Sequence, residues 1–182
     1  MTAQSAIQSG TYALDTTHST VGFVVRHAMV TKVRGSFDEF DATINFDAAN
    51  PAASSTSATI KSDSINTNNA DRDAHLRTAD FFDTENFSEL TFTSTAIEFK
   101  NSENATVTGD LTIKGITKSV SLDVELLGSA EDPYGNTRVG FEARTTINRK
   151  DFGIDFNAPL NTGGVLLSED IKIEIEGSAV KQ

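Results

Sequence analysis

Three histidines carry the side chains best suited to acid–base chemistry in this chain, and one of them has an acid and a hydroxyl nearby. Asp15 and Ser19 flank His18, which gives the residue types of a hydrolytic triad. A triad depends on geometry imposed by the fold and not on closeness in sequence, and the chain has no Gly-x-Ser-x-Gly nucleophile elbow. We interpret these residues as polar groups that tie down the start of a strand, and we predict no catalytic residue and no enzyme activity.

A second polar group has the residue types of a metal site. Asp71, Asp73 and His75 occupy alternate positions, and alternate residues of a helix point in different directions. The chain also contains no Cys, which excludes disulfides and thiolate ligands. We therefore predict neither a metal ion nor a cofactor.

His27 and Arg149 have the spacing of inward-facing residues. His27 follows Val25 by two positions, and Arg149 follows Ile147 by two. An inward histidine is usually a hydrogen-bonded core residue, and a buried arginine needs a partner or a path to water. Two interpretations stay open for both side chains, namely contact with the polar end of a ligand or a structural role.

Alternation of apolar and polar residues determines where these side chains point. The pattern is clearest over residues 105–113, 120–126, 139–147 and 171–175. A strand with one buried face and one wet face produces such alternation. Turn residues at 132–136 and 115–118, and a loop at 157–164, separate the segments. The sequence therefore predicts an all-β protein of about eight strands.

The apolar positions change parity twice within this pattern. Phe37 is odd whereas Phe40 is even, and Phe92 is even whereas Ile97 is odd. A slip of one residue turns every later side chain to the opposite face. We predict a β-bulge near residues 38–39 and another near Thr95, which would keep the apolar side chains on one face.

One stretch lacks the alternation. Residues 69–77 have acidic residues early and basic residues late, which suits the dipole of a helix. We predict one short helix near residues 69–79, with Asn68 or Asn69 as its N-cap.

Composition and charge exclude several classes of function. The chain has 182 residues, with 15 Lys and Arg against 26 Asp and Glu, so the net charge is -11. This charge repels nucleic acid and anionic membrane surfaces, so we expect neither as a partner. No apolar run reaches the length of a membrane helix, and we expect no stable membrane insertion. The N-terminal residues do not resemble a signal peptide, which favours the cytoplasm, although a periplasmic or secreted protein would look the same once its leader is removed.

The predicted interior is apolar but contains small residues. Twelve Phe supply bulk, whereas Ala42, Ala105, Gly109 and Ala143 occupy inward positions. An eight-stranded barrel can be filled by side chains or hold one small ligand. Alternation alone leaves both possibilities open.

Four motifs resemble those of YceI-like proteins and occur in the same order. They are Tyr12-Ala-Leu-Asp15-Thr-Thr-His18-Ser19, Arg72-Asp73-x-His75-Leu76, Gly109-Asp-Leu111-Thr-Ile113-x-Gly115, and Ile147-Asn-Arg149-x-Asp-Phe152-Gly153. The resemblance implies one lipid-binding domain over residues 1–182, with a core of about 11–180. It implies an eight-stranded antiparallel lipocalin-like barrel and a homodimer.

The resemblance also implies a ligand class. It points to a long-chain apolar lipid, a polyisoprenoid or an isoprenoid quinone, bound inside the barrel for transport, storage or sequestration. The alternatives are an enzyme acting on an isoprenoid or lipid head group, and a stress-related scaffold with a filled barrel. From parity we expect the ligand to contact Phe23, Val25, His27, Phe37, Phe92, Leu111, Phe141, Arg149 and Phe152.

Overall fold

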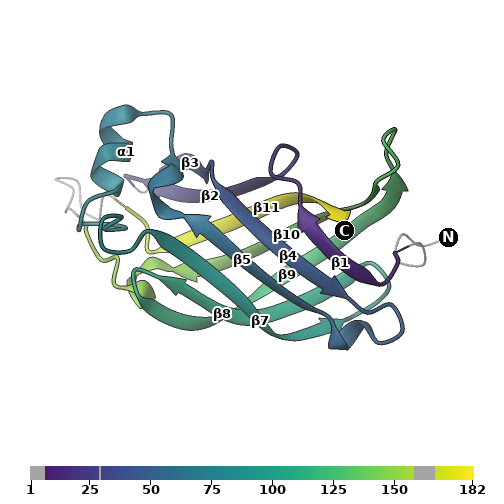
Figure 1. Cartoon of the computed structure of the whole chain (residues 1–182). Helices are drawn as coiled ribbons and strands as arrows, with labels where there is room; N and C mark the ends of the chain where they lie inside the picture. Colours follow the sequence, from purple (N-terminus) through teal and green to yellow (C-terminus); the bar gives the residue numbers. More distant parts are fainter. Residues whose placement is uncertain (1–6, 29, 158–166) are drawn as a thin grey trace.

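The described part of the chain folds around one antiparallel sheet of 11 strands, with one α-helix at its end (Figure 1). The structure is a computed structural model that describes residues 7–28, 30–157 and 167–182. Its strands are β1 (Gly10–Leu14), β2 (Thr20–His27), β3 (Thr31–Phe37), β4 (Phe40–Phe46), β5 (Ser55–Lys61), β6 (Ile65–Asn66), β7 (Glu89–Phe99), β8 (Asn104–Ile113), β9 (Ile116–Glu131), β10 (Thr137–Asn148) and β11 (Asp170–Lys181). The α-helix is α1 (Ala70–Leu76), and short 3₁₀ helices cover Pro51–Ala53, Ser62–Ser64 and Arg149–Phe152.

Strand β11 closes the sheet into a barrel. Its residues Ala179–Lys181 pair with β1, and its residues Lys172–Glu176 pair with β2. The β1 pairing completes a ring of eight strands in the order β1-β4-β5-β7-β8-β9-β10-β11. Strands β2, β3 and β6 extend the sheet beyond the ring. The predicted eight-stranded antiparallel barrel with one helix is therefore confirmed.

The two predicted bulges have different outcomes. The β7–β8 register shifts between Ser94 and Ala96, so the bulge at Thr95 is confirmed. The bulge predicted near residues 38–39 was wrong, because β3 ends at Phe37 and β4 begins at Phe40. These two strands have different partners, so the parity change marks a break between strands and not an extra residue within one.

A further register shift was not predicted. It lies between Gly140 and Phe141 of β10, where Leu127 is the extra residue on β9. Leu127 is apolar although it is exposed. Its residue type therefore gives no sign in the sequence that it is the extra residue of a bulge. The loop predicted for residues 157–164 lies, apart from Asn157, outside the described residues.

The short helix forms where it was predicted, although it ends earlier. The Asn69 side chain accepts a hydrogen bond from Arg72 N at 3.0 Å, so Asn69 is the N-cap. The chain turns back after the helix, with Phe82 N donating to Leu76 O. In the described part of the chain, no helix has the length and apolarity needed to span a bilayer.

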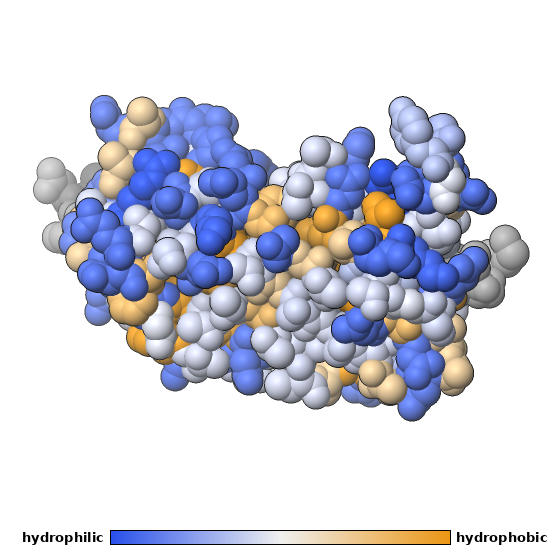
Figure 2. Space-filling model, in the orientation of Figure 1, coloured by the Kyte–Doolittle hydropathy of each residue, from blue (hydrophilic) through white to orange (hydrophobic). Residues whose placement is uncertain are grey.

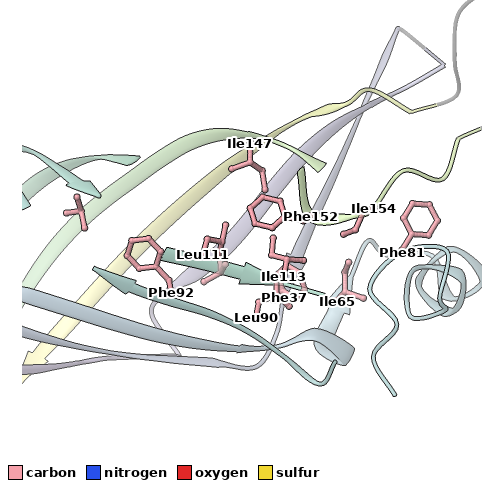
Figure 3. Close-up of a cluster of buried hydrophobic side chains, with 12 residues drawn as sticks. Phe37, Ile65, Phe81, Leu90, Phe92, Leu111, Ile113, Ile147, Phe152 and Ile154 are labelled. Carbon is pink, nitrogen blue, oxygen red and sulfur yellow. The ribbon is translucent and has the colours of Figure 1, made fainter. Parts of the chain in front are cut away.

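Apolar side chains fill the end of the barrel next to α1. Ile65, Phe81, Phe152 and Ile154 belong to one buried cluster with the inward residues of the barrel, and we call these four residues the plug. Figure 3 shows Phe152 and Ile154 between the barrel residue Leu111 and Phe81 beside the helix. The plug blocks this end of the barrel and leaves the middle for the site described below.

Candidate functional site

A cavity of about 260 Å³ lies inside the ring of strands. Many inward aliphatic side chains are only half-buried, among them Leu122 and Val124 of β9 and Ile175 of β11. Side chains that face a packed core would be fully buried. The barrel is therefore hollow in its middle and is not filled by its phenylalanines.

Most residues of the cavity wall are apolar. Its residues are Ile7, Tyr12, Leu14, Val21, Gly22, Phe23, Phe37, Phe40, Asp41, Ala42, Ile44, Phe46, Ser54, Thr56, Ala58, Ile60, Leu90, Phe92, Ile97, Phe99, Ala105, Val107, Leu111, Ile113, Val120, Leu122, Val124, Leu126, Val139, Phe141, Ala143, Thr145, Ile173, Ile175 and Ala179. Most belong to the alternating sets expected from the sequence. Such a wall can hold an apolar molecule through dispersion and the hydrophobic effect.

Five of these residues have polar side chains, and none forms a reactive cluster. They are Tyr12, Asp41, Ser54, Thr56 and Thr145. The Tyr12 hydroxyl donates to Gln8 O at 2.7 Å, and burial raises the pKa of Tyr12, against the opposing effect of that hydrogen bond. Within the described wall, Asp41 is the one ionisable group besides this phenol. The wall therefore offers few polar groups to a ligand.

One edge of β4 is unpaired next to the cavity in the described structure. Strand β4 pairs with β1 only from Thr43 onward, so in the described structure Phe40–Ala42 pair with β5 alone. Leu14 of β1 and Val21 of β2 line the cavity across from this edge. Figure 2 shows apolar side chains in a hollow between the part that carries α1 and β3 and the part that carries β1. A long chain could enter or leave at this gap.

The structure brings together five of the nine predicted ligand contacts. Phe23, Phe37, Phe92, Leu111 and Phe141 all line the cavity. They come from five strands, which the parity pattern places on one inner surface. Contact of these side chains with a ligand stays a prediction.

Val25 and His27 lie outside the cavity wall described above. The pairing of β2 with β11 ends at Val24, and beyond it β2 continues as a hairpin with β3. Val25 is half-buried and His27 is exposed. Parity identifies the face of a strand, but the barrel does not continue behind this part of β2, so that face meets no cavity.

Arg149 is buried in the segment that follows β10 and does not line the cavity. Its Nε donates to Ser168 O at 2.9 Å, and its Nη1 donates to Ile154 O at 2.8 Å and Phe156 O at 2.9 Å. Its Nη2 has no hydrogen-bond partner among the described residues. Burial lowers the pKa of Arg149, whereas the charges of Glu169 and Asp155 act in the opposite direction.

These contacts give Arg149 a structural role. The guanidinium joins the end of β10 to Ile154 of the plug, to Phe156, and to Ser168 just before β11. Phe152 is also absent from the wall because it is a fully buried member of the plug. The positions of both residues follow from the 3₁₀ helix Arg149–Phe152, in which the alternation of the preceding strand no longer holds.

The polar group around His18 is an ion-pair network and not a triad. His18 Nδ1 lies 2.8 Å from Asp15 Oδ2, which also accepts from Arg138 Nη1 at 2.6 Å. Ser19 Oγ accepts from Ser178 N at 3.0 Å. Arg138 and the other hydrogen bonds hold the pKa of the Asp15 carboxyl well below its usual range. The network fastens the β1–β2 connection to β10 and β11.

The residues considered for a metal site also make separate contacts. The Asp73 carboxylate is buried and accepts from Thr67 N at 2.9 Å, whereas His75 Nε2 lies 2.9 Å from Asp80 Oδ2. Within the described residues, no group of three or more His, Asp or Glu side chains is arranged to hold a metal ion. Asp73 anchors α1 to the segment before it.

The comparison with protein families matches the YceI-like domain over residues 12–179. This chain belongs to the YceI-like family. UPF0312 protein SAS2572 of Staphylococcus aureus is 43% identical over 164 residues, which cover 90% of this chain and 93% of that protein. Protein YceI of Escherichia coli is 41% identical over 160 residues, or 88% of this chain and 81% of that protein.

Solved structures share the fold of this YceI-like chain. BcnA of Burkholderia cenocepacia superposes with a TM-score of 0.80 at 25% identity, covering 91% of this chain and 98% of BcnA. A domain of Saccharophagus degradans described as polyisoprenoid binding has a TM-score of 0.70 at 15% identity, covering 96% of this chain and 100% of that domain. At that identity the second likeness supports the fold alone.

Several motif residues that carry the family resemblance lie outside the cavity in this YceI-like chain. Asp15 and His18 join the network at the β1–β2 connection, Arg72 donates to Thr67 O at 2.6 Å beside α1, and Arg149 holds three carbonyls. These polar residues stabilise connections between strands. The cavity depends on apolar residues. Individually, these are less distinctive in a sequence than the polar motif residues.

Proposed function

We propose that this protein binds a long-chain apolar lipid, a polyisoprenoid or an isoprenoid quinone, inside the barrel for transport, storage or sequestration. The observation that carries the proposal is the hollow, apolar interior of a closed barrel. A Saccharophagus degradans domain that shares this fold is described as polyisoprenoid binding, and we propose the same class of ligand here.

Burial of the chain supplies the binding energy. Each methylene group transferred from water contributes about 0.8 kcal/mol. Lost translational and conformational freedom offsets part of that gain. The cavity volume of about 260 Å³ is just below the range of about 300–1,000 Å³ typical of small-molecule pockets. We therefore expect a long chain to be held over part of its length, with the remainder in the opening beside Phe40–Ala42.

The alternatives are favoured less by this arrangement. An enzyme acting on a lipid or its head group would need reactive polar groups facing the cavity, and its two candidates, His27 and Arg149, are not part of the described wall. A scaffold with a filled barrel would lack the cavity. We propose a binding protein and not an enzyme.

Native mass spectrometry of freshly purified protein, followed by lipid extraction and mass analysis, tests the proposal. We expect an adduct with the mass of an isoprenoid lipid. Protein that is always recovered empty, and that takes up no added long-chain lipid, would refute it.

A variant that fills the cavity makes the test specific to this site. Ala42 of β4 lines the cavity and is half-buried, so the larger side chain of Ala42→Leu would occupy space needed by the lipid. We expect lipid occupancy to fall several-fold. Ala96→Leu is the matched control, because Ala96 is exposed on β7 and is absent from the described wall. Equal occupancy of the two variants would place the lipid elsewhere.

The oligomeric state and the compartment stay predictions. We propose a homodimer in the cytoplasm without a nucleic acid partner. Light scattering of the purified protein tests the dimer, and fractionation of the source cells tests the compartment.

A further inference from the structure

Three phenylalanines of the cavity wall lie against glycines of neighbouring strands. The pairs are Phe23 with Gly35, Phe92 with Gly109 and Phe141 with Gly177. Two of the pairs are directly opposite in the strand register, Phe23 with Gly35 and Phe141 with Gly177. The same contact therefore recurs at three places around the wall.

Each ring occupies the space that a side chain on the glycine would take. A Cβ at Gly177 would lie 2.3 Å from Phe141 Cζ and 2.4 Å from Phe141 Cε1. A Cβ at Gly35 would lie 2.3 Å from Phe23 Cζ. Gly177 follows Ile173 and Ile175 at the inward positions of β11. Each ring therefore lies against the wall and covers an inward position where glycine has no side chain.

We propose that Gly35, Gly109 and Gly177 are positioning residues that set the width of the cavity by letting these rings lie against its wall. The width so gained admits a methyl-branched chain, whereas a narrower cavity would admit only an unbranched one. The inference rests on the proposed function and names the property of the lipid that the cavity selects, which is the thickness of its chain.

An alanine at Gly177 would displace the ring and not the strand. Carbon atoms in contact are about 3.5–4.0 Å apart, so the ring would have to move by more than about 1 Å from its position 2.3 Å from the new Cβ. Strands β10 and β11 are paired continuously from Arg138–Val180 to Asn148–Asp170, which resists their separation. The Phe141 ring lines an unfilled cavity and can turn into it.

Gly109 is less suited to a test. A Cβ there would lie 2.5 Å from the Thr93 carbonyl oxygen as well as 2.5 Å from Phe92 Cζ. An alanine at this position would therefore disturb the pairing of β7 with β8, and its effect on the cavity would be mixed with an effect on the fold. At Gly177 and Gly35 the three nearest atoms all belong to the ring.

The experiment compares two alcohols. Their main chains have the same number of carbon atoms but differ in thickness. Geranylgeraniol has methyl branches, and hexadecanol has the same main-chain length without them. For Gly177→Ala we expect affinity for geranylgeraniol to fall on the order of tenfold relative to hexadecanol, the size of effect that one misfitting methyl group produces. Gly140→Ala is the matched control. A Cβ at Gly140 would lie 3.7 Å from Leu127 Cβ, which is an ordinary van der Waals contact. This variant should keep the wild-type ratio of affinities for the two alcohols.

A second substitution distinguishes the ring from a general loss of structure. Gly177→Ala/Phe141→Leu removes the aromatic ring and should restore the wild-type ratio. A crystal structure of Gly177→Ala should show the Phe141 ring inside a smaller cavity. Three results for Gly177→Ala would overturn this inference alone. They are an unchanged ratio of affinities for the two alcohols, an equal loss of affinity for both, and a Phe141 ring that stays in place. Failure of the wild type to bind either alcohol would overturn the proposed function together with it.

Discussion

Arg149 shows at the residue scale how a buried charge can serve structure with no carboxylate of the described residues in direct contact. Its guanidinium donates to the carbonyls of Ser168, Ile154 and Phe156. We predict that Arg149→Lys destabilises the protein by about 3 kcal/mol, because one ammonium group cannot satisfy all three buried acceptors. Urea unfolding measures the change.

A matched substitution separates this role from the loss of a guanidinium in general. Arg144 is exposed on β10, and its Nη2 lies 3.4 Å from Glu142 Oε2, so Arg144→Lys should change stability by less than about 0.5 kcal/mol. Equal effects of the two substitutions would contradict the structural role of Arg149.

The ion-pair network around Arg138 makes stability depend on pH. Arg138 Nε donates to Asp132 Oδ2 at 2.7 Å and lowers the pKa of Asp132 to about 2. A carboxyl whose pKa is lower in the folded state stabilises the protein above its unfolded pKa of about 4, and that contribution is lost as the pH falls toward the folded value. We predict that wild type is more stable than Asp132→Asn at neutral pH and that the difference shrinks between about pH 4 and pH 2.

Unfolding in urea across this pH range measures the difference. Asp110→Asn, at an exposed position of β8, controls for the loss of one negative charge. A difference between wild type and Asp132→Asn that is constant down to pH 2 would exclude the network as its source.

At the scale of elements, two adjacent asparagines before α1 have different roles. Asn69 caps the helix, whereas Asn68 has a positive φ of 61°. Asn69→Ala should cost about 1 kcal/mol, and Asn68→Gly should be neutral or stabilising because glycine adopts that conformation without strain. Urea unfolding and amide exchange of Ala70–Leu76 measure both effects. A larger loss for Asn68→Gly would reverse this assignment.

Strand positions were predictable because alternation records which face of each strand is buried. The bulge at Thr95 was predictable for the same reason, since it shifts parity within one continuous pairing. The break between Phe37 and Phe40 produces the same parity signal although its cause is different. Parity also continues through Val25 and His27 although the barrel ends beside them. Such distinctions depend on which strands become neighbours, and alternation within one strand does not contain that information.

At the scale of the whole molecule, the cavity follows from how the rings are arranged more than from how many there are. Twelve Phe would be enough to fill much of a small barrel. Phe141 instead covers the empty position of Gly177, and Phe152 belongs to the plug. Sequence parity predicted the inward direction of Phe141 but not the turn of its ring along the wall. For this reason the choice between a hollow and a filled barrel required the structure.

The net charge of -11 predicts how the protein would meet membranes that donate or accept the proposed lipid. An anionic surface repels the protein, and salt screens that repulsion over a Debye length of about 30 Å at 0.01 M and about 3 Å at 1 M. We predict that transfer of a fluorescent isoprenoid is several-fold slower from vesicles containing an anionic lipid than from purely zwitterionic vesicles at low salt. The two rates should converge at high salt, as stopped-flow fluorescence can measure. A preference for anionic vesicles at low salt would show that a local basic surface, and not the overall charge, controls the encounter.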